Sequence, residues 1–600
     1  MTDTRSSHAM PFGAAVQADG TVRFRLWAPG AETVTLEIDG DTRLPMEREE
    51  GWFTLATDRA GPGSAYRFIL ADGLAVPDPA SRWQPDGVHG PSRVVDPASY
   101  AWTASAWRGR PWHETVLYEL HVGTFTPEGT YRAAIGRLGH LVETGVTAVE
   151  LMPLAQCPGG RNWGYDGVQL FAPHAAYGTP DDLKALIDAA HTRGLMVFLD
   201  VVYNHFGPEG NYLGAYAPGF FTGRHTTPWG AAINFDGADA RPVRDFMIHN
   251  ALYWLEEYRI DGLRLDAVHA IMDDSSPHIL EELARRVRAE TGPERHVHLV
   301  LENEHNSARL LARDGGEPRF HTAQWNDDYH HAAHVLAAGE SVGYYGGYAA
   351  DPIAGLCRAL AEGFIYQGDP SPLHGGAPRG EVSRHLPPPA FVNFLQNHDQ
   401  IGNRAFGERL TVLAPPDRVA ALLTITLLAP SIPLLFMGEE WGETNPFAFF
   451  TDFGGDLADA VREGRRREFA AFPEFADPER RARIPDPNAH DTFVRSRLDW
   501  GKVTQEPFAS RLALVRRLLR LRAARIAPLL PGAGGGAVLW RQGAGFSIAW
   551  TLAGGAGLTL VAHLGDGTVM PPLPPSGEAL VGGDVPDRLS GWTARWFLQS

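Results

Sequence analysis

The chain has 600 residues, of which 44% are apolar and 21% are charged. This length exceeds one compact core and predicts two to four domains of a globular protein. The formal net charge, 53 − 71 = −18, disfavours nucleic acid and anionic membrane surfaces as partners, but it does not oppose a neutral ligand such as a sugar.

The first residues contain no apolar segment of the signal-peptide type. The chain has two cysteines, Cys157 and Cys357, which are too few for a disulfide framework or a cysteine-based metal site. Its most apolar run, from Ala420 to Met437, is interrupted by prolines and therefore indicates a buried helix followed by a buried strand, not a membrane span. We expect a cytoplasmic protein that does not associate with a membrane.

Residues 10 to about 100 show short stretches in which apolar and polar side chains alternate. Val22–Trp27 alternates with a period of two and is followed by a turn at Pro29 and Gly30, and Val34–Ile38 alternates again. Such spacing is typical of antiparallel strands and predicts an N-terminal β-sandwich over residues 1–105. We interpret the segment 77–91, which is rich in proline, glycine and aspartate, as a linker or docking segment.

From about residue 115 the pattern changes to helices that alternate with buried strands. The clearest unit begins at Thr179, an expected N-cap that is followed by Pro180 and, three residues after the cap, by Asp182. Apolar residues then recur at helical spacing until Gly194. The uninterrupted apolar run Leu195–Leu199 is typical of a strand buried on both faces.

Similar units recur along the chain and predict a (β/α)8 barrel with inserted loops over residues 106–527. The expected strands are 116–121, 148–152, 195–199, 260–266, 298–302, 321–325, 391–396 and 433–437, of which the sixth has the weakest pattern. A helical stripe from Phe508 to Leu519 predicts the final helix. After Pro531 short alternation returns and predicts a C-terminal β-sandwich within residues 528–600.

In barrels of this kind the active site lies at the carboxyl ends of the strands. Four of the predicted strand ends carry carboxylates or histidines: Asp200 with Asn204 and His205, Arg264 with Asp266, Glu302, and Asn397 with His398 and Asp399. A single aspartate at a strand end is more often the N-cap of the next helix than a catalytic group. Four such ends together favour a shared catalytic site.

Glycoside hydrolysis needs one carboxylate that attacks or stabilises the oxocarbenium-like sugar and one protonated carboxyl that donates to the leaving oxygen. Burial and a like-charged neighbour raise the pKa of the donor. Arg264 lies two residues before Asp266 on a strand, shares its face, and is expected to keep Asp266 ionised. We predict a retaining enzyme in which the carboxyl groups of Asp266 and Glu302 lie roughly 5–5.5 Å apart.

Other kinds of site have weaker support. His330, His331 and His334 lack the carboxylate–histidine spacing of a zinc site, and we interpret them as part of a solvated or substrate-facing loop. The chain has no Walker-type or dinucleotide-binding glycine pattern after a strand. We therefore expect no metal and no cofactor.

Four segments of the chain resemble, in order, the signature regions of the alpha-amylase superfamily. These segments are Asp200–His205, Asp261–Ala267, Leu301–Glu302 and Phe394–Asp399. The resemblance implies that Asp266 is the nucleophile, Glu302 the acid/base and Asp399 the residue that stabilises the transition state. Glu304 is a rival for the acid role because it follows Glu302 by two residues.

Within this superfamily the chain resembles the family of maltooligosyltrehalose trehalohydrolases. The resemblance is carried by Gln324–His331, by Gln396–Arg404, and by Phe436–Glu443 together with residues 446–453. It implies hydrolysis of the α-1,4 bond next to the terminal trehalosyl unit of maltooligosyltrehalose, with release of trehalose. It also implies a pathway partner, maltooligosyltrehalose synthase.

The chain departs from ordinary amylases at Gln396, where they usually have aspartate, and at Ala270, where they usually have histidine. A glycogen branching or debranching enzyme is the alternative, although branching enzymes usually read Ser-His-Asp-Glu where residues 397–400 read Asn-His-Asp-Gln. A non-catalytic glucan-binding protein is disfavoured by the intact catalytic trio.

The residues expected to bind substrate are His205, Arg264, His269, Asp328, Asn397 and His398. A trehalose unit folds back relative to maltose and has no reducing end, so we expect a closed pocket on the leaving-group side. Its walls are predicted from the loops after the fourth, fifth and sixth strands. There Asp328 is predicted to bind trehalose hydroxyls and Trp325 to support the wall, although core packing explains Trp325 equally well.

Overall fold

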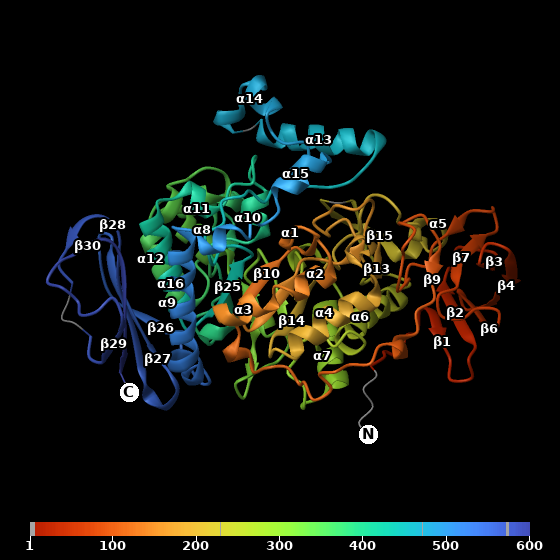
Figure 1. Ribbon diagram of the computed structural model, residues 1–600, viewed down its shortest axis with the longest axis horizontal. Helices are drawn as coiled ribbons and strands as arrows, with labels where there is room; N and C mark the ends of the chain where they lie inside the picture. The colour runs from red at the N-terminus through yellow and green to blue at the C-terminus, as the bar shows by residue number, and fades with distance from the viewer. Residues whose placement is uncertain (1–5, 229, 471, 572–574, 600) are drawn as a thin grey trace.

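The computed structural model describes residues 6–228, 230–470, 472–571 and 575–599, and its centre is a closed barrel of eight parallel strands (Figure 1). In barrel order the strands are β10 (Leu117–Leu120), β11 (Ala148–Leu151), β14 (Met196–Val201), β17 (Gly262–Leu265), β18 (His298–Leu301), β21 (Ala323–Trp325), β24 (Phe391–Asn393) and β25 (Ile432–Phe436). All eight predicted strands are confirmed, including the weak sixth one, β21, which has only three residues.

The longer helices of the barrel are α3 (Leu138–Thr144), α4 (Pro180–His191), α6 (Ala240–Glu256), α7 (Ile279–Thr291), α8 (Asp327–Ala338), α9 (Pro352–Glu362), α12 (Pro416–Leu428) and α16 (Phe508–Leu521). Helix α4 begins as predicted. The side chain of Thr179 accepts from Asp182 N, the side chain of Asp182 accepts from Thr179 N, and Pro180 occupies the first helical position. Because this capping box satisfies backbone donors that the helix leaves free, it fixes where the helix starts.

The interpretation of the histidine group as a loop is wrong, because His330, His331 and His334 lie on helix α8. Asn326 caps this helix by accepting from Tyr329 N, and Gly339 ends it in the left-handed conformation. His330 and His334 are buried, and the ring of His334 stacks on Tyr345 at a centroid distance of 4.1 Å. His334 Nε2 also lies 2.8 Å from Glu340 Oε2, so aromatic packing and a carboxylate occupy the surroundings of His330 and His334.

Two antiparallel sheets form the predicted N-terminal sandwich, in the strand orders β1-β2-β6-β5 and β4-β3-β7-β8. The strands are β1 (Gly13–Val16), β2 (Val22–Trp27), β3 (Val34–Ile38), β4 (Thr42–Pro45), β5 (Glu47–Glu49), β6 (Trp52–Thr57), β7 (Ala65–Leu70) and β8 (Ala75–Val76). The segment 77–91 docks against the barrel. Its buried Arg82 lies 4.0 Å from a carboxylate oxygen of Glu257, and Val88 O accepts from the side chain of Gln169.

The described C-terminal strands form one five-stranded antiparallel sheet in the order β26-β27-β28-β30-β29. They are β26 (Gly536–Gln542), β27 (Gly545–Thr551), β28 (Gly557–Val569), β29 (Glu578–Val581) and β30 (Leu589–Gln599). The sheet packs on α9 and α12, and Trp550 Nε1 donates to Leu360 O. The C-terminal β domain that the sequence predicts thus takes its second layer from the barrel helices.

A helical excursion projects from the barrel between β25 and α16 (Figure 1). It contains α13 (Gly455–Phe469), α14 (Pro478–Ala482) and α15 (His490–Arg495). Arg465 of α13 donates to the carbonyl oxygens of Gly402 and Arg404, which holds α13 close to the short helix α10 (His398–Gly402). In the described part of the chain we find no helix with the length and apolar character needed to cross a membrane.

Candidate active site

The guanidinium group of Arg264 organises the candidate site. It is fully buried at the end of β17, where Nη1 donates to Asp200 Oδ2 at 2.6 Å and to Asp266 Oδ1 at 2.8 Å. Nη2 donates to Glu302 Oε2 at 2.8 Å. The three carboxylates come from the carboxyl ends of the neighbouring strands β14, β17 and β18. As the sequence predicts, Asp266 and Glu302 lie together at one end of the barrel.

Asp266 and Glu302 each receive a second hydrogen bond that fixes the carboxyl group. Asn204 Nδ2 donates to Asp266 Oδ2 at 2.8 Å, and Ala267 N donates to Glu302 Oε2 at 2.7 Å. Glu304, in contrast, is about half exposed and lies near His269 and His374, away from the Arg264 guanidinium. The geometry therefore favours Glu302 over Glu304 as the carboxyl group that acts with Asp266.

Asp399 enters the site from α10, after β24. Asn397 caps this helix by accepting from Asp399 N, and Asp399 Oδ1 lies 3.4 Å from His398 Nε2. The other ring nitrogen of His398, Nδ1, lies 2.5 Å from Glu119 Oε1. Burial alone would lower the pKa of His398, but the carboxylates of Asp399 and Glu119 outweigh burial and raise it to about 9. His398 therefore carries a positive charge next to Asp399 near neutral pH.

Two further side chains join this network and were missed in the sequence. The hydroxyl of Tyr165 donates to Asp200 Oδ2 at 2.6 Å and lies 2.8 Å from His398 Nε2. Glu119 is buried within β10 and binds His398 from below the site. A carboxylate inside an otherwise apolar strand was the available signal for Glu119, whereas no local pattern distinguishes Tyr165.

The remaining predicted histidines lie at the edge of the Arg264 network. His205 follows Asn204, and its Nε2 lies 2.9 Å from Tyr165 O. Burial lowers the pKa of His205 and favours its neutral form. His269 lies in the loop after β17, where its Nε2 is 3.8 Å from Glu304.

Asp328 does not have the role that the sequence suggests. Its side chain is completely buried, and both carboxylate oxygens already accept hydrogen bonds. The donors are Asn306 Nδ2, Tyr348 OH, Ile365 N, Tyr366 N and Arg379 Nη1. A carboxylate occupied by five donors has no position left for a trehalose hydroxyl, so Asp328 anchors loops behind the site.

Trp325 is also buried, with 1% of its surface exposed. It packs among apolar side chains of the barrel interior, and the guanidinium of Arg264 lies 4.2 Å from its ring centroid. The core-packing interpretation of Trp325 is therefore the correct one. Its ring supports Arg264 from the barrel side through a cation–π contact and does not form a wall for sugar.

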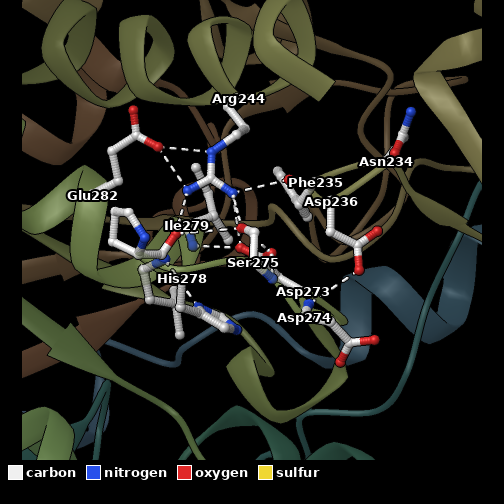
Figure 2. Close-up of polar contacts among 12 residues, drawn as sticks. Asn234, Phe235, Asp236, Arg244, Asp273, Asp274, Ser275, His278, Ile279 and Glu282 are labelled. Carbon is white, nitrogen blue, oxygen red and sulfur yellow. Dashed lines mark hydrogen bonds and ion pairs between the residues drawn. The ribbon is translucent and has the colours of Figure 1, made fainter. Parts of the chain in front are cut away.

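A buried ion-pair network anchors the loop that follows β17 and carries His269 (Figure 2). Arg244 of α6 donates to Glu282 of α7 and, at 2.9 Å, to Asp273 Oδ2 within the loop. The same guanidinium donates to Ser275 Oγ and to Pro277 O. One guanidinium thus holds Asp273, Ser275 and Pro277 of this loop against α6.

Among the described residues, one group could hold a metal ion. It consists of His225, Asp236 and Asp274, whose possible ligand atoms lie within 4.8 Å of one another. Asp236 already has two partners. Arg224 Nη1 lies 3.1 Å from its Oδ1, and His225 Nε2 lies 2.8 Å from its Oδ2. Arg224 also lies 3.8 Å from Asp274 Oδ2, and a positive charge next to both carboxylates disfavours a bound cation.

Family models match two parts of the chain. The alpha amylase catalytic domain matches residues 92–217. Carbohydrate-binding module 48, also described as the isoamylase N-terminal domain, matches residues 11–78. The first match includes the strands β10, β11 and β14, and the second lies within the N-terminal sandwich.

Several relatives span most of the chain. A malto-oligosyltrehalose trehalohydrolase of Deinococcus radiodurans is 45% identical over 83% of this chain and 80% of its own length. The crystal structure of a protein from Salmonella typhimurium, provisionally described as an alpha amylase, superimposes on this chain with a TM-score of 0.94. The two sequences are 48% identical, and the match covers 99% of this chain and 100% of the other chain. In contrast, a 1,4-alpha-glucan branching enzyme of Streptomyces avermitilis is 36% identical over only 42% of this chain and 32% of its own.

Proposed function

The chain belongs to the malto-oligosyltrehalose trehalohydrolase family, and we propose that it hydrolyses the α-1,4-glucosidic bond next to the terminal trehalosyl unit of a maltooligosyltrehalose and releases trehalose. The observation that carries the proposed chemistry is the placement of Asp266 and Glu302 on the two terminal nitrogens of one guanidinium group. This arrangement supports a retaining mechanism with one nucleophilic and one proton-donating carboxyl.

In the first step of the proposed mechanism, Asp266 attacks the anomeric carbon while Glu302 donates its proton to the glycosidic oxygen. Trehalose leaves, and the maltooligosyl chain remains bonded to Asp266. In the second step Glu302 takes a proton from water, and the resulting hydroxide displaces Asp266 from the anomeric carbon. Each step passes through an oxocarbenium-like state whose positive charge Asp399 stabilises.

The electrostatics of the site support these separate roles. Asp200, Asp266 and Glu302 all bind the single positive charge of Arg264, so the cluster carries more negative than positive charge when fully ionised. Asp266 also accepts a hydrogen bond from Asn204, which fixes the orientation of its carboxyl group. Burial raises the pKa of Asp200 to about 7 against the opposing charge of Arg264, so the cluster retains a proton near neutral pH.

Two features beyond the chemistry follow from the same assignment. We propose that a maltooligosyltrehalose synthase supplies the substrate, because a trehalosyl end must be made before it is released. We also propose a cytoplasmic location, which the buried unpaired thiols of Cys157 and Cys357 support.

We further propose three functional units: a glucan-binding-like domain over residues 1–105, a catalytic barrel over 106–527 and a β domain over 528–600.

Product analysis tests the proposed function. The wild-type enzyme and an Asp266→Asn variant are incubated with maltooligosyltrehalose and, separately, with amylose, and the products are identified. We expect the wild type to release trehalose and a shortened maltooligosaccharide, and the variant to release neither. Formation of α-1,6 branches in amylose without release of trehalose would replace this function with that of a branching enzyme.

A further inference from the structure

Glu119 is a buried carboxylate of β10 that the mechanism above does not use. Its Oε1 lies 2.5 Å from the imidazole Nδ1 of His398, and its Oε2 accepts from the backbone N of the same histidine at 3.2 Å. Both side chains have only 1% of their surface exposed. One carboxylate therefore holds both the ring and the main chain of His398, at the start of α10.

The other side of the His398 imidazole faces two acceptors of the site. Nε2 lies 2.8 Å from the hydroxyl oxygen of Tyr165 and 3.4 Å from Asp399 Oδ1. The hydroxyl of Tyr165 has a single proton, which it donates to Asp200 Oδ2 at 2.6 Å. Because that proton is used, the hydroxyl accepts from His398. Nε2 of His398 therefore carries a proton that points at Tyr165.

The hydrogen-bond partners of His398 thus require a proton on each ring nitrogen. An ionised carboxylate only accepts, so the contact with Glu119 needs a proton on Nδ1, and the contact with Tyr165 needs one on Nε2. A neutral imidazole carries one proton and would leave one of these two contacts without a donor. The imidazolium is the form of the ring that satisfies both contacts.

We propose that Glu119 is a positioning residue of the site, which holds His398 as an imidazolium with its Nε2 proton directed at Tyr165 and Asp399. The kinetic consequence of this inference rests on the proposed glycosidase function. A fixed positive charge beside Asp399 keeps that carboxylate ionised, as the stabilisation of an oxocarbenium-like state requires. Glu119 acts only through His398, because its own side chain is buried.

The electrostatic balance around His398 agrees with this geometry. The titratable and charged groups that face it are Glu119 of β10, His121 after β10, Glu150 of β11, Tyr165, Asp200 of β14 behind Tyr165, Arg264 of β17 and Asp399 of α10. Burial lowers the pKa of His398 and Arg264 opposes its charge, but Asp399 and Glu119 outweigh both and raise the pKa to about 9. His121 is uncharged near neutral pH, because burial lowers its pKa to about 3.

NMR of the enzyme with histidine-selective 13Cε1 labelling tests the protonation of His398 directly and without reference to turnover. The signal of His398 is identified by its absence from a His398→Gln variant. In the wild type we expect a pKa of about 9 for His398, well above the ordinary histidine value of about 6.5. Glu119→Gln keeps an oxygen that accepts from Nδ1 but removes the charge, so the titration should move down by about one to three pH units. Glu119→Asp keeps the charge and should stay closer to the wild type.

Glu150→Gln is the matched control. Glu150 lies on β11 as the register partner of Glu119 and is equally buried, but among the described residues neither of its carboxylate oxygens has a hydrogen-bond partner. Burial, and then the charge of Glu119, raise the pKa of Glu150 well above its usual value, so the amide replaces a neutral acid. This variant should leave the titration of His398 as it is in the wild type.

The pH dependence of kcat on maltooligosyltrehalose supplies a second readout. Relative to the wild type, Glu119→Gln should lose turnover progressively as the pH rises through the lowered pKa of its His398, whereas a merely structural defect lowers the rate equally at every pH. An unchanged titration of His398 in Glu119→Gln overturns the proposal. A wild-type His398 that is uncharged at neutral pH also overturns it, even if the variant does not fold. Absence of trehalose release by the wild type instead contradicts the proposed function, and the NMR titrations then still decide the role of Glu119.

Discussion

At the scale of single residues, the site depends on which carboxyl group holds a proton and which stays ionised. Asp266 receives hydrogen bonds from Arg264 and Asn204, which hold its carboxyl group in place before substrate binds. Glu302 shares the same guanidinium but receives its second hydrogen bond from the backbone, from Ala267 N. Two carboxyl groups of one cluster thereby acquire different tasks from different surroundings.

Replacing Glu302 by glutamine tests the acid role. The amide keeps an oxygen that can accept from Arg264 and Ala267, so the fold should be preserved, but it has no proton to donate. We expect kcat on maltooligosyltrehalose to fall by roughly 10²–10⁴-fold, the usual contribution of a general acid. Thermal unfolding measured in parallel should change little.

Glu304→Gln is the control for this experiment, because Glu304 is two residues away and about half exposed. It should retain most of the wild-type rate. An inactive Glu304→Gln together with an active Glu302→Gln would transfer the acid role to Glu304 and contradict the assignment made from the Arg264 contacts.

Some residue roles follow from local spacing and others do not. The two-residue interval between Arg264 and Asp266 places both side chains on one face of a strand, and the structure confirms their contact. Asp327 and Asp328 are also adjacent acids at a helix start, but the sequence does not show how that helix is rotated against the barrel. For this reason the substrate contact was predicted for Asp328, whose carboxylate in fact binds protein donors.

At the scale of elements, the barrel strands were predictable because parallel strands buried on both faces consist of apolar runs. Helix α8 was predictable only in part. Asn326 and Gly339 mark its ends, but its histidines suggested a polar loop because their burial depends on Tyr345 and Tyr348 of a later segment. Glu119 and His398 are 279 residues apart, and no local pattern predicts a contact at that separation.

The loops behind the site depend on the buried carboxylate of Asp328, which makes a prediction at this scale. Asp328→Ala leaves Arg379 buried without its ion-pair partner and deprives Ile365 N and Tyr366 N of their acceptor. Removing one member of a buried pair costs about 3–5 kcal/mol. We expect the free energy of unfolding in urea to fall by about this amount, and activity on all substrates to fall together.

Asp351→Ala provides a comparison, because Asp351 caps α9 at an exposed position. Loss of this cap should cost only about 1 kcal/mol. If Asp328→Ala unfolded like the wild type and selectively lost the ability to release trehalose, Asp328 would have to be a trehalose contact after all.

At the scale of the whole molecule, the two β domains lie on opposite sides of the barrel, and α13–α15 project beyond it near α10 (Figure 1). In this arrangement loops and α10, and not the β domains, lie at the carboxyl ends of the barrel strands. The overall layout was predictable from the change of sequence pattern at about residues 115 and 531. How each β domain attaches was not, because attachment depends on contacts such as Trp550 with Leu360 between distant segments.

The charge distribution of the molecule leads to a final prediction about metal ions. With a net charge of −18, nonspecific cation association is expected, yet the His225, Asp236 and Asp274 group already has Arg224 as its cation. The proposed reaction is completed by carboxyl groups and needs no metal-activated water. Exhaustive chelation followed by assay and thermal unfolding should therefore leave both trehalose release and the unfolding temperature unchanged. A loss of either that returns only when a divalent cation is added back would establish an essential cation, and Asp236→Asn would then show whether this group binds it.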